Sequence, residues 1–193
     1  MNKAVMLSIQ PKWCELIAIG KKTIEVRKTR PSIETPFKCY IYCTKGRDLL
    51  RAVNVAIVKR NGTHESRTTC KIYNESYVTN KVLNGRVIGE FVCDYIDEYK
   101  YSMANYGGLD IDCQQLDDTC LTKQQVEEYA NGKHLYGWHI SDLVIYDKPR
   151  ELGEFKRGCN DSYDPMYGSY CADCDKKCRI TRPPQSWMYV EEV

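Results

Sequence analysis

The sequence predicts an α+β fold class, with strands arranged in a mixed, barrel-like sheet and few helices. Segments with the alternation or the branched and aromatic composition of β-strands recur along the chain, whereas only two segments have clear helical spacing. The length of 193 residues is enough for one domain with a substantial core. Strands that outnumber helices and do not alternate with them favour α+β over a parallel α/β sheet.

The N-terminal segments predict a strand, a helix and a second strand. Residues 4–9 (AVMLSI) form an apolar run typical of a buried strand. Pro11 suits the first turn of a helix, and Trp13, Leu16 and Ile17 follow at helical spacing before Gly20 ends the helix. The chain then returns through KTIEVRK, whose alternation predicts a strand.

The middle of the chain predicts two strong strands separated by an excursion. Residues 37–45 (FKCYIYCTK) and 85–96 (GRVIGEFVCDYI) have strand composition, and Gly89 suggests a bulge. Between them, AVNVAIV precedes a polar stretch with the turn signal Asn61-Gly62. We expect this excursion to be a hairpin outside the core sheet.

The remaining segments predict a helix and three further strands. Residues 99–119 read as a long irregular connection, and Thr122 with Gln125 forms a capping-box pattern before the helical segment KQQVEEYA. LYGWHI and LVIYD predict strands, and a last strand follows the prolines of RPPQSW. One domain over residues 1–193 is expected, with insertions at about 47–84 and 159–178.

The chain has no apolar run approaching the ~20 residues of a membrane span, and its start lacks a signal-peptide pattern. A cytoplasmic location without membrane association is therefore expected, and thiols stay reduced there. The 11 cysteines then read as buried small hydrophobes, metal ligands or reactive thiols rather than disulfides.

Four cysteines in the C-terminal insertion suggest a metal site. Cys171, Cys174 and Cys178 follow a C-x2-C-x3-C pattern, and eleven residues separate Cys159 from Cys171. Four thiolates in a polar segment without its own apolar core suit a structural zinc ion with no open coordination position. Reduced thiols without metal are the alternative.

A basic run marks the most interesting candidate site. Residues 21–30 (KKTIEVRKTR) contain five Lys or Arg and one Glu in a chain whose net charge is only +2. Such a local patch suits a phosphate-bearing ligand, although a solvated strand face has the same pattern. Glu25 and Arg27 have the same parity on the strand, so their side chains point to one side, within reach of Lys22.

The ordered set LSIQPKWCELIAIGKKTIEVRK, CYIYCTKG, GRVIGEF, YGWHISDLVIYDKP and RPPQSW resembles the ASCH domain family of the PUA-like superfamily. The resemblance covers most of the chain outside the two insertions. It implies a small, curved mixed β-barrel flanked by short helices, here with the Cys-rich C-terminal insertion. It also implies a cleft beside the first helix and the following strand that holds RNA or a nucleotide.

The resemblance also suggests which side chains line that cleft. In this cleft, Arg27 would offer a planar guanidinium to a phosphate or a base edge. Lys22 would supply a localised positive charge, and Glu25 would accept a hydrogen bond from an exocyclic amine. The nucleic-acid-binding residues expected from the charged run and the neighbouring segments are Lys21, Lys22, Glu25, Arg27, Thr44, Lys45, Ser186 and Trp187.

Binding is the leading functional prediction, with hydrolysis as the alternative. Some relatives resemble amidohydrolases that act on acetylated cytidine, a modified nucleoside, and others are reported as ribonucleases. Lys22 and Glu25 would be the catalytic residues of such an enzyme, but the amidohydrolase-like relatives carry Thr where this chain has Glu25. A protein-interaction module is a third reading. The ligand and the oligomeric state stay open.

Overall fold

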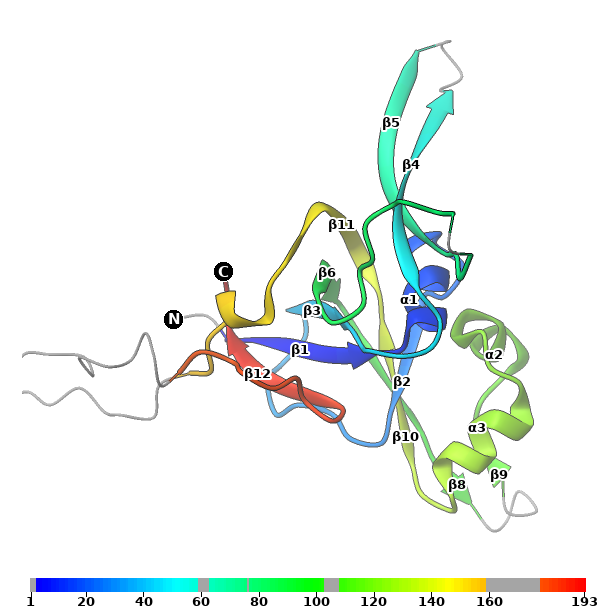
Figure 1. The fold of residues 1–193 in the computed structure, drawn as a ribbon. Coiled ribbons are helices and arrows are strands. Elements are labelled where there is room, and N and C mark those ends of the chain that lie inside the picture. The colour runs from blue at the N-terminus through cyan, green and yellow to red at the C-terminus, as the bar shows by residue number, and fades with distance from the viewer. Residues whose placement is uncertain (1–2, 59–62, 76, 103–107, 159–177) are drawn as a thin grey trace, which may run out of the picture.

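The computed structural model describes residues 3–58, 63–75, 77–102, 108–158 and 178–193 (Figure 1). These residues form mixed sheets with few helices, as the α+β prediction requires. The elements are β1 (Lys3–Ile9), α1 (Pro11–Ala18), β2 (Ile24–Arg27), β3 (Phe37–Cys43), β4 (Leu50–Val58), β5 (His64–Ile72), β6 (Val87–Cys93), β7 (Ile96–Tyr99), β8 (Tyr101–Ser102), β9 (Gly108–Leu109), α2 (Cys113–Thr119), α3 (Lys123–Ala130), β10 (Leu135–His139), β11 (Ser141–Arg150), the 3-10 turn η2 (Leu152–Glu154) and β12 (Trp187–Glu191).

The largest sheet has five strands in the order β11-β6-β3-β1-β12. β1 pairs in parallel with β3 and antiparallel with β12, so this sheet is mixed. Its register is irregular beside Gly89. The adjacent residues Ile41 and Tyr42 of β3 pair with Gly89 and Val87, so β6 has one extra residue there, which confirms the suggested bulge. The pairing of β11 with β6 is also irregular between Ile145 and Arg150. The hydrogen-bonded strands of the described residues do not close into a barrel.

A smaller sheet carries the charged strand. The strand order of this sheet is β2-β10-β7, so β2 is an edge strand. The central strand β10 pairs antiparallel with both β2 and β7. Val26 packs with Val126 and Ala130 of α3 in one apolar cluster. This packing fixes α3 beside β2, where the two lie in Figure 1.

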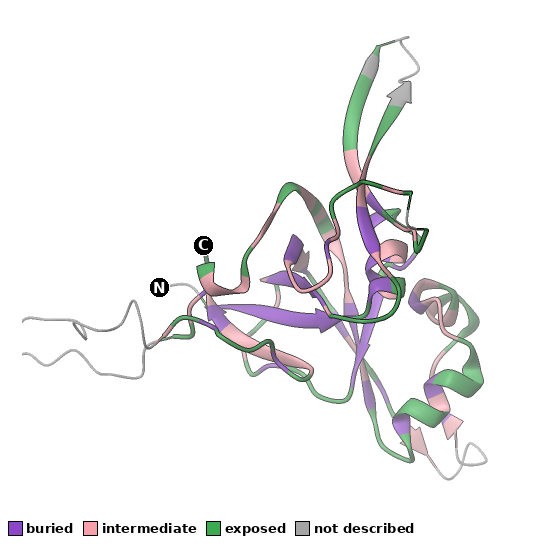
Figure 2. Ribbon diagram, in the orientation of Figure 1, coloured by how far each residue is buried: buried purple, intermediate pink, exposed green. Residues whose placement is uncertain are grey.

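β4 and β5 form the predicted hairpin, paired antiparallel along their whole length. Figure 1 shows it projecting from the body, and Figure 2 shows that its outer half is exposed. Only its base packs on the core, through residues such as Leu50 and Cys70. The predicted turn Asn61-Gly62 lies outside the described residues, and the domain limits with their insertions stay a prediction.

The predicted irregular connection over residues 99–119 contains a helix that the sequence reading missed. α2 begins after Asp112, whose side chain accepts from the Gln115 N–H at 2.7 Å while the Gln115 side chain accepts from the Asp112 N–H. The predicted capping box of α3, Thr122 with Gln125, is present in the same form. No helix in the described parts of the chain is long and apolar enough to span a membrane.

Five cysteines lie buried in the core, at positions 14, 39, 43, 70 and 93. Burial raises the pKa of Cys14 and Cys39 well above the usual range, and it raises the pKa of Cys70 to about 12. A thiol with so high a pKa stays protonated at neutral pH and packs as a small hydrophobe. Burial in the core therefore supports the first of the three readings, that of small buried hydrophobes, for these five cysteines.

Candidate ligand-binding pocket

A pocket of about 500 Å³ lies between the edge strand β2, the end of β1 and the first turns of α1 and α3. Its volume falls within the range of small-molecule sites. Residues from four separate parts of the chain line it: Ser8, Ile9, Gln10, Trp13, Lys22, Glu25, Val26, Arg27, Thr44, Leu121, Gln125, Tyr129, Gln185 and Ser186.

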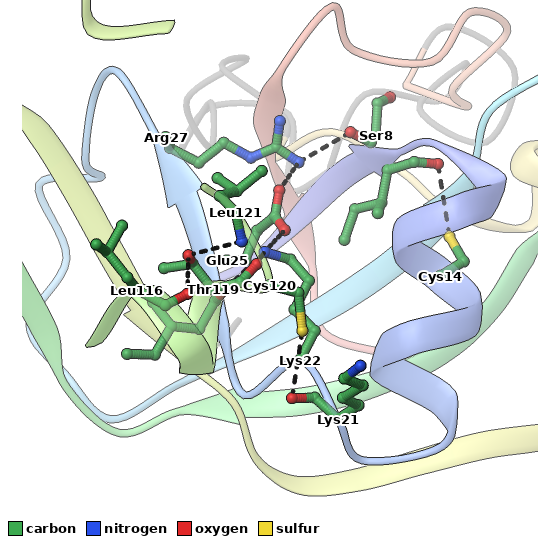
Figure 3. Close-up of polar contacts among 12 residues, drawn as sticks. Ser8, Cys14, Lys21, Lys22, Glu25, Arg27, Leu116, Thr119, Cys120 and Leu121 are labelled. Carbon is green, nitrogen blue, oxygen red and sulfur yellow. Dashed lines mark hydrogen bonds and ion pairs between the residues drawn. The ribbon is translucent and has the colours of Figure 1, made fainter. Parts of the chain in front are cut away.

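Lys22 is buried beside this pocket with its ammonium group fully engaged (Figure 3). Its Nζ donates to the carbonyl oxygens of Ile24 and Thr119, each at 2.7 Å, and lies 3.3 Å from Glu25 Oε2. The three oxygens account for the three N–H bonds of an ammonium. The bond to Thr119 also ties the segment just before β2 to the last residue of α2, and α3 begins four residues after it.

Glu25 joins Lys22 to Arg27. Its second carboxylate oxygen, Oε1, lies 3.1 Å from Arg27 Nη2, which also donates to the Ser8 carbonyl at 2.9 Å (Figure 3). Arg27 Nε is buried and has no hydrogen-bond partner among the described residues. An unsatisfied buried N–H costs roughly 1–3 kcal/mol, so Arg27, which lines the pocket, carries one donor without a partner among the described residues.

The charged face of β2 is therefore a buried surface. All four residues of β2 are buried, and Lys22, Glu25 and Arg27 are only 3%, 6% and 8% exposed. Of the two readings that the charge pattern left open, a solvated strand face does not fit this burial. Two cations and one carboxylate leave an excess positive charge that favours an anionic or acceptor-rich ligand.

The helix α3 contributes pocket residues that the sequence reading did not propose. Gln125 and Tyr129 are four positions apart, and therefore lie on one face of the helix. Burial raises the pKa of Tyr129, while the Arg27 guanidinium acts in the opposite direction, so the phenol stays a hydrogen-bond donor at neutral pH. The tyrosine-rich composition and the i, i+4 spacing were the available signals, but neither places α3 beside β2.

The other proposed residues divide into two groups. Thr44 and Ser186 line the pocket, whereas Lys21, Lys45 and Trp187 do not. Trp187 instead packs against Trp138 and Tyr189, and its Nε1 donates to Thr29 Oγ1 at 2.9 Å. Trp187 is therefore partly buried against the core and does not lie at the pocket where it was expected to bind nucleic acid.

Trp13, from α1, supplies an aromatic surface in its place. It lines the pocket and is partly buried, and Lys22 Nζ lies 5.4 Å from the centre of its ring. Such a distance permits a cation–π interaction that orients the indole.

The predicted zinc site lies mostly outside the described residues. Cys159, Cys171 and Cys174 belong to the undescribed segment, and Cys178 is the one member of the set that is placed. Within the described residues, no group of three or more His, Cys, Asp or Glu side chains is arranged to hold a metal ion. The zinc ion thus stays a prediction, to be checked by metal analysis of the wild type and a Cys174→Ser variant.

The pocket chemistry suits recognition better than bond cleavage. The three N–H bonds of the Lys22 ammonium each have an oxygen partner, and each Glu25 oxygen already faces a cation, so a role in proton transfer would require either group to give up a contact. The unused capacity belongs to Arg27, and to the phenol of Tyr129 and the hydroxyl groups of Thr44 and Ser186 on the same wall.

Comparison with known proteins identifies a family. The family model for the ASCH domain matches residues 7–105. A search of curated proteins finds no match. The chain is similar to the crystal structure of ASCH from Zymomonas mobilis, with a TM-score of 0.51 and 17% identity over 98% of this chain and 88% of that one. Two point mutants of the Zymomonas protein match with a TM-score of 0.53 at 15% and 16% identity, over 98% and 99% of this chain and 89% and 92% of theirs.

Proposed function

The chain belongs to the ASCH domain family, and on this premise we propose that it binds RNA or a nucleotide in the pocket beside β2. RNA is the preferred candidate. One observation carries the proposal: a buried Lys22–Glu25–Arg27 group lines a pocket of about 500 Å³ with net positive charge and an unpartnered Arg27 Nε.

The side chains around this group suit the parts of a nucleotide. The Arg27 guanidinium matches acceptor pairs on a base edge or a phosphate. Trp13 and Tyr129 offer aromatic surface, and stacking of a base on such a ring is worth about 1–3 kcal/mol. Thr44 and Ser186 supply hydroxyls that can either donate or accept.

Binding is preferred to hydrolysis because of the contacts of the two proposed catalytic residues. A catalytic Lys22 would have to give up at least one of its three oxygen partners, and Glu25 would have to leave Lys22 or Arg27. Three paired charges held this way, with one positive charge in excess, position a ligand without supplying a base or nucleophile.

The proposal is tested by the affinity of a Tyr129→Ala variant for a fluorescent mixed-sequence single-stranded RNA of about ten nucleotides. Tyr129 is 37% exposed, so its truncation leaves most of the core untouched. We expect affinity to fall about tenfold, because a stacking surface and a donor beside Arg27 are lost. Fluorescence anisotropy titrations at one fixed salt concentration measure the affinity of each variant for the RNA.

The matched control is Tyr77→Ala, which removes a tyrosine that is 80% exposed and does not line the pocket. This control should bind RNA as the wild type does. Equal affinities for wild type, Tyr129→Ala and Tyr77→Ala would show that RNA does not use this pocket.

A further inference from the structure

A second, smaller pocket adjoins the first. It has a volume of about 230 Å³ and shares Gln10 and Thr44 with the larger pocket. Its other lining residues come from the start of α1 and the loop after β3: Pro11, Lys12, Lys45, Gly46, Arg47 and Asp48. The shared residues make the two pockets neighbours along one surface.

The smaller pocket is strongly basic. Lys12, Lys45 and Arg47 surround it, with Asp48 as its only acidic lining residue. The three cations are exposed, and none of them forms an ion pair with the described residues. Three cations and one carboxylate leave this concave surface with an excess of positive charge, which attracts an anion.

The loop that carries two of these cations is held in place. The Thr44 N–H donates to the Ile9 carbonyl at 2.8 Å, and Asn84 Nδ2 donates to the Asp48 carbonyl at 2.9 Å. The Leu49 N–H donates to Asn74 Oδ1 at 2.7 Å. Side chains on a fixed loop lose less entropy when they bind, so the loop presents its charges at low cost.

The stem of Lys45 is also positioned by the backbone. Gly85 has φ of +83°, and a Cβ added there would lie 3.2 Å from Lys45 Cε. The glycine therefore leaves room for the lysine stem to lie against the body of the protein.

The first residues of α1 also line this smaller pocket. Gln10 is the N-cap residue and makes no side-chain cap hydrogen bond, and Pro11 occupies the first turn. The positive end of the helix dipole adds to the field of the three cations. A phosphate group carries the charge and the acceptor oxygens that this combination favours.

We propose that the smaller pocket is a phosphate subsite, which binds the phosphate of a nucleotide whose nucleoside occupies the larger pocket. This inference rests on the proposed function and adds to it that the protein recognises a nucleoside together with an attached phosphate. The nucleoside contacts Arg27, Trp13 and Tyr129, and its phosphate lies past Gln10 and Thr44 between Lys12, Lys45 and Arg47. The phosphate is either terminal or part of an RNA chain.

The test compares ligands with and without phosphate on matched variants. The four ribonucleosides, their 5′- and 3′-monophosphates, and the ten-nucleotide RNA are titrated against wild type, Lys45→Ala/Arg47→Ala and Lys133→Ala/Lys148→Ala. Both double variants remove two exposed cations, and Lys133 and Lys148 lie outside both pockets. The two double variants therefore change the net charge of the protein by the same amount.

For the wild type, we expect at least one monophosphate to bind about tenfold more tightly than its nucleoside, since charge-assisted hydrogen bonds are worth that much. The Lys45→Ala/Arg47→Ala variant should lose this advantage and keep the affinity for the nucleoside, whereas the control variant keeps both. If the phosphate belongs to an RNA chain, the log–log slope of RNA affinity against salt concentration should fall by about 0.7, the value for one phosphate contact, and only in the Lys45→Ala/Arg47→Ala variant.

The remaining outcomes of these titrations would overturn the phosphate subsite, either alone or together with the proposed function. Nucleoside binding without a phosphate advantage and with an unchanged RNA slope would overturn the subsite while leaving the proposed function intact. Equal losses in the two double variants would also overturn it, because net charge alone would explain them. Binding of none of these ligands would overturn both proposals.

Discussion

At the scale of single residues, Glu25 controls the charge balance of the pocket. The alternation of KTIEVRK predicted that Glu25 and Arg27 share one side of the strand, and their ion pair at 3.1 Å agrees with this. The sequence could not predict that this side is buried, because burial depends on how β1 and α3 pack around β2, which no local pattern shows. Local charge patterns look alike on a solvated strand and in a pocket.

Replacing Glu25 with Gln should lower the free energy of unfolding by about 3 kcal/mol, because Lys22 and Arg27 would then be buried without a compensating charge. Urea denaturation measures the change. Glu98→Gln on the exposed face of β7 is the control, and we expect it to stay within about 0.5 kcal/mol of the wild type. Similar values for both variants would contradict the described charge balance.

At the scale of elements, the sequence predicted β1, α1, β2, β3, the hairpin and α3, and it missed α2. The helix α2 spans seven residues, CQQLDDT, of which only Thr119 is buried, so it has no apolar periodicity to detect. Its signal was the Asp112–Gln115 capping box, the same kind of signal that identified α3. Capping boxes therefore identify short helices whose apolar periodicity is weak or absent.

Gly89 marks a close approach between strands that a larger residue cannot reproduce. A Cβ at this position would come into hard contact with the Val144 carbonyl oxygen and lie 3.2 Å from Ile145 Cα. Gly89→Ala should therefore separate β6 from β11 and lower the free energy of unfolding by about 2 kcal/mol.

Gly153→Ala is the matched control for Gly89→Ala, because a Cβ at Gly153 would meet no heavy atom within 4 Å. Thermal and urea denaturation of the two variants should differ clearly. If Gly89→Ala is as stable as Gly153→Ala, the β6–β11 pairing is wrong at this point.

At the scale of the whole molecule, the pocket is a product of tertiary structure. Its walls come from β1, α1 and β2 near the N-terminus, from α3 in the middle and from residues 185–186 near the C-terminus. The N-terminal wall could be predicted because it is continuous in sequence. The contribution of α3 could not, since it depends on the Lys22–Thr119 hydrogen bond across 97 positions and on the packing of Val26.

The location of RNA on the protein tests the central claim most directly. Ultraviolet cross-linking of a single-stranded RNA that contains 4-thiouridine, followed by peptide mass spectrometry, identifies the contact residues. We expect cross-links in the peptides that contain Trp13, residues 44–48 and Tyr129, which line the two pockets. Cross-links confined to the β4–β5 hairpin or to β11, with none in these peptides, would contradict the account.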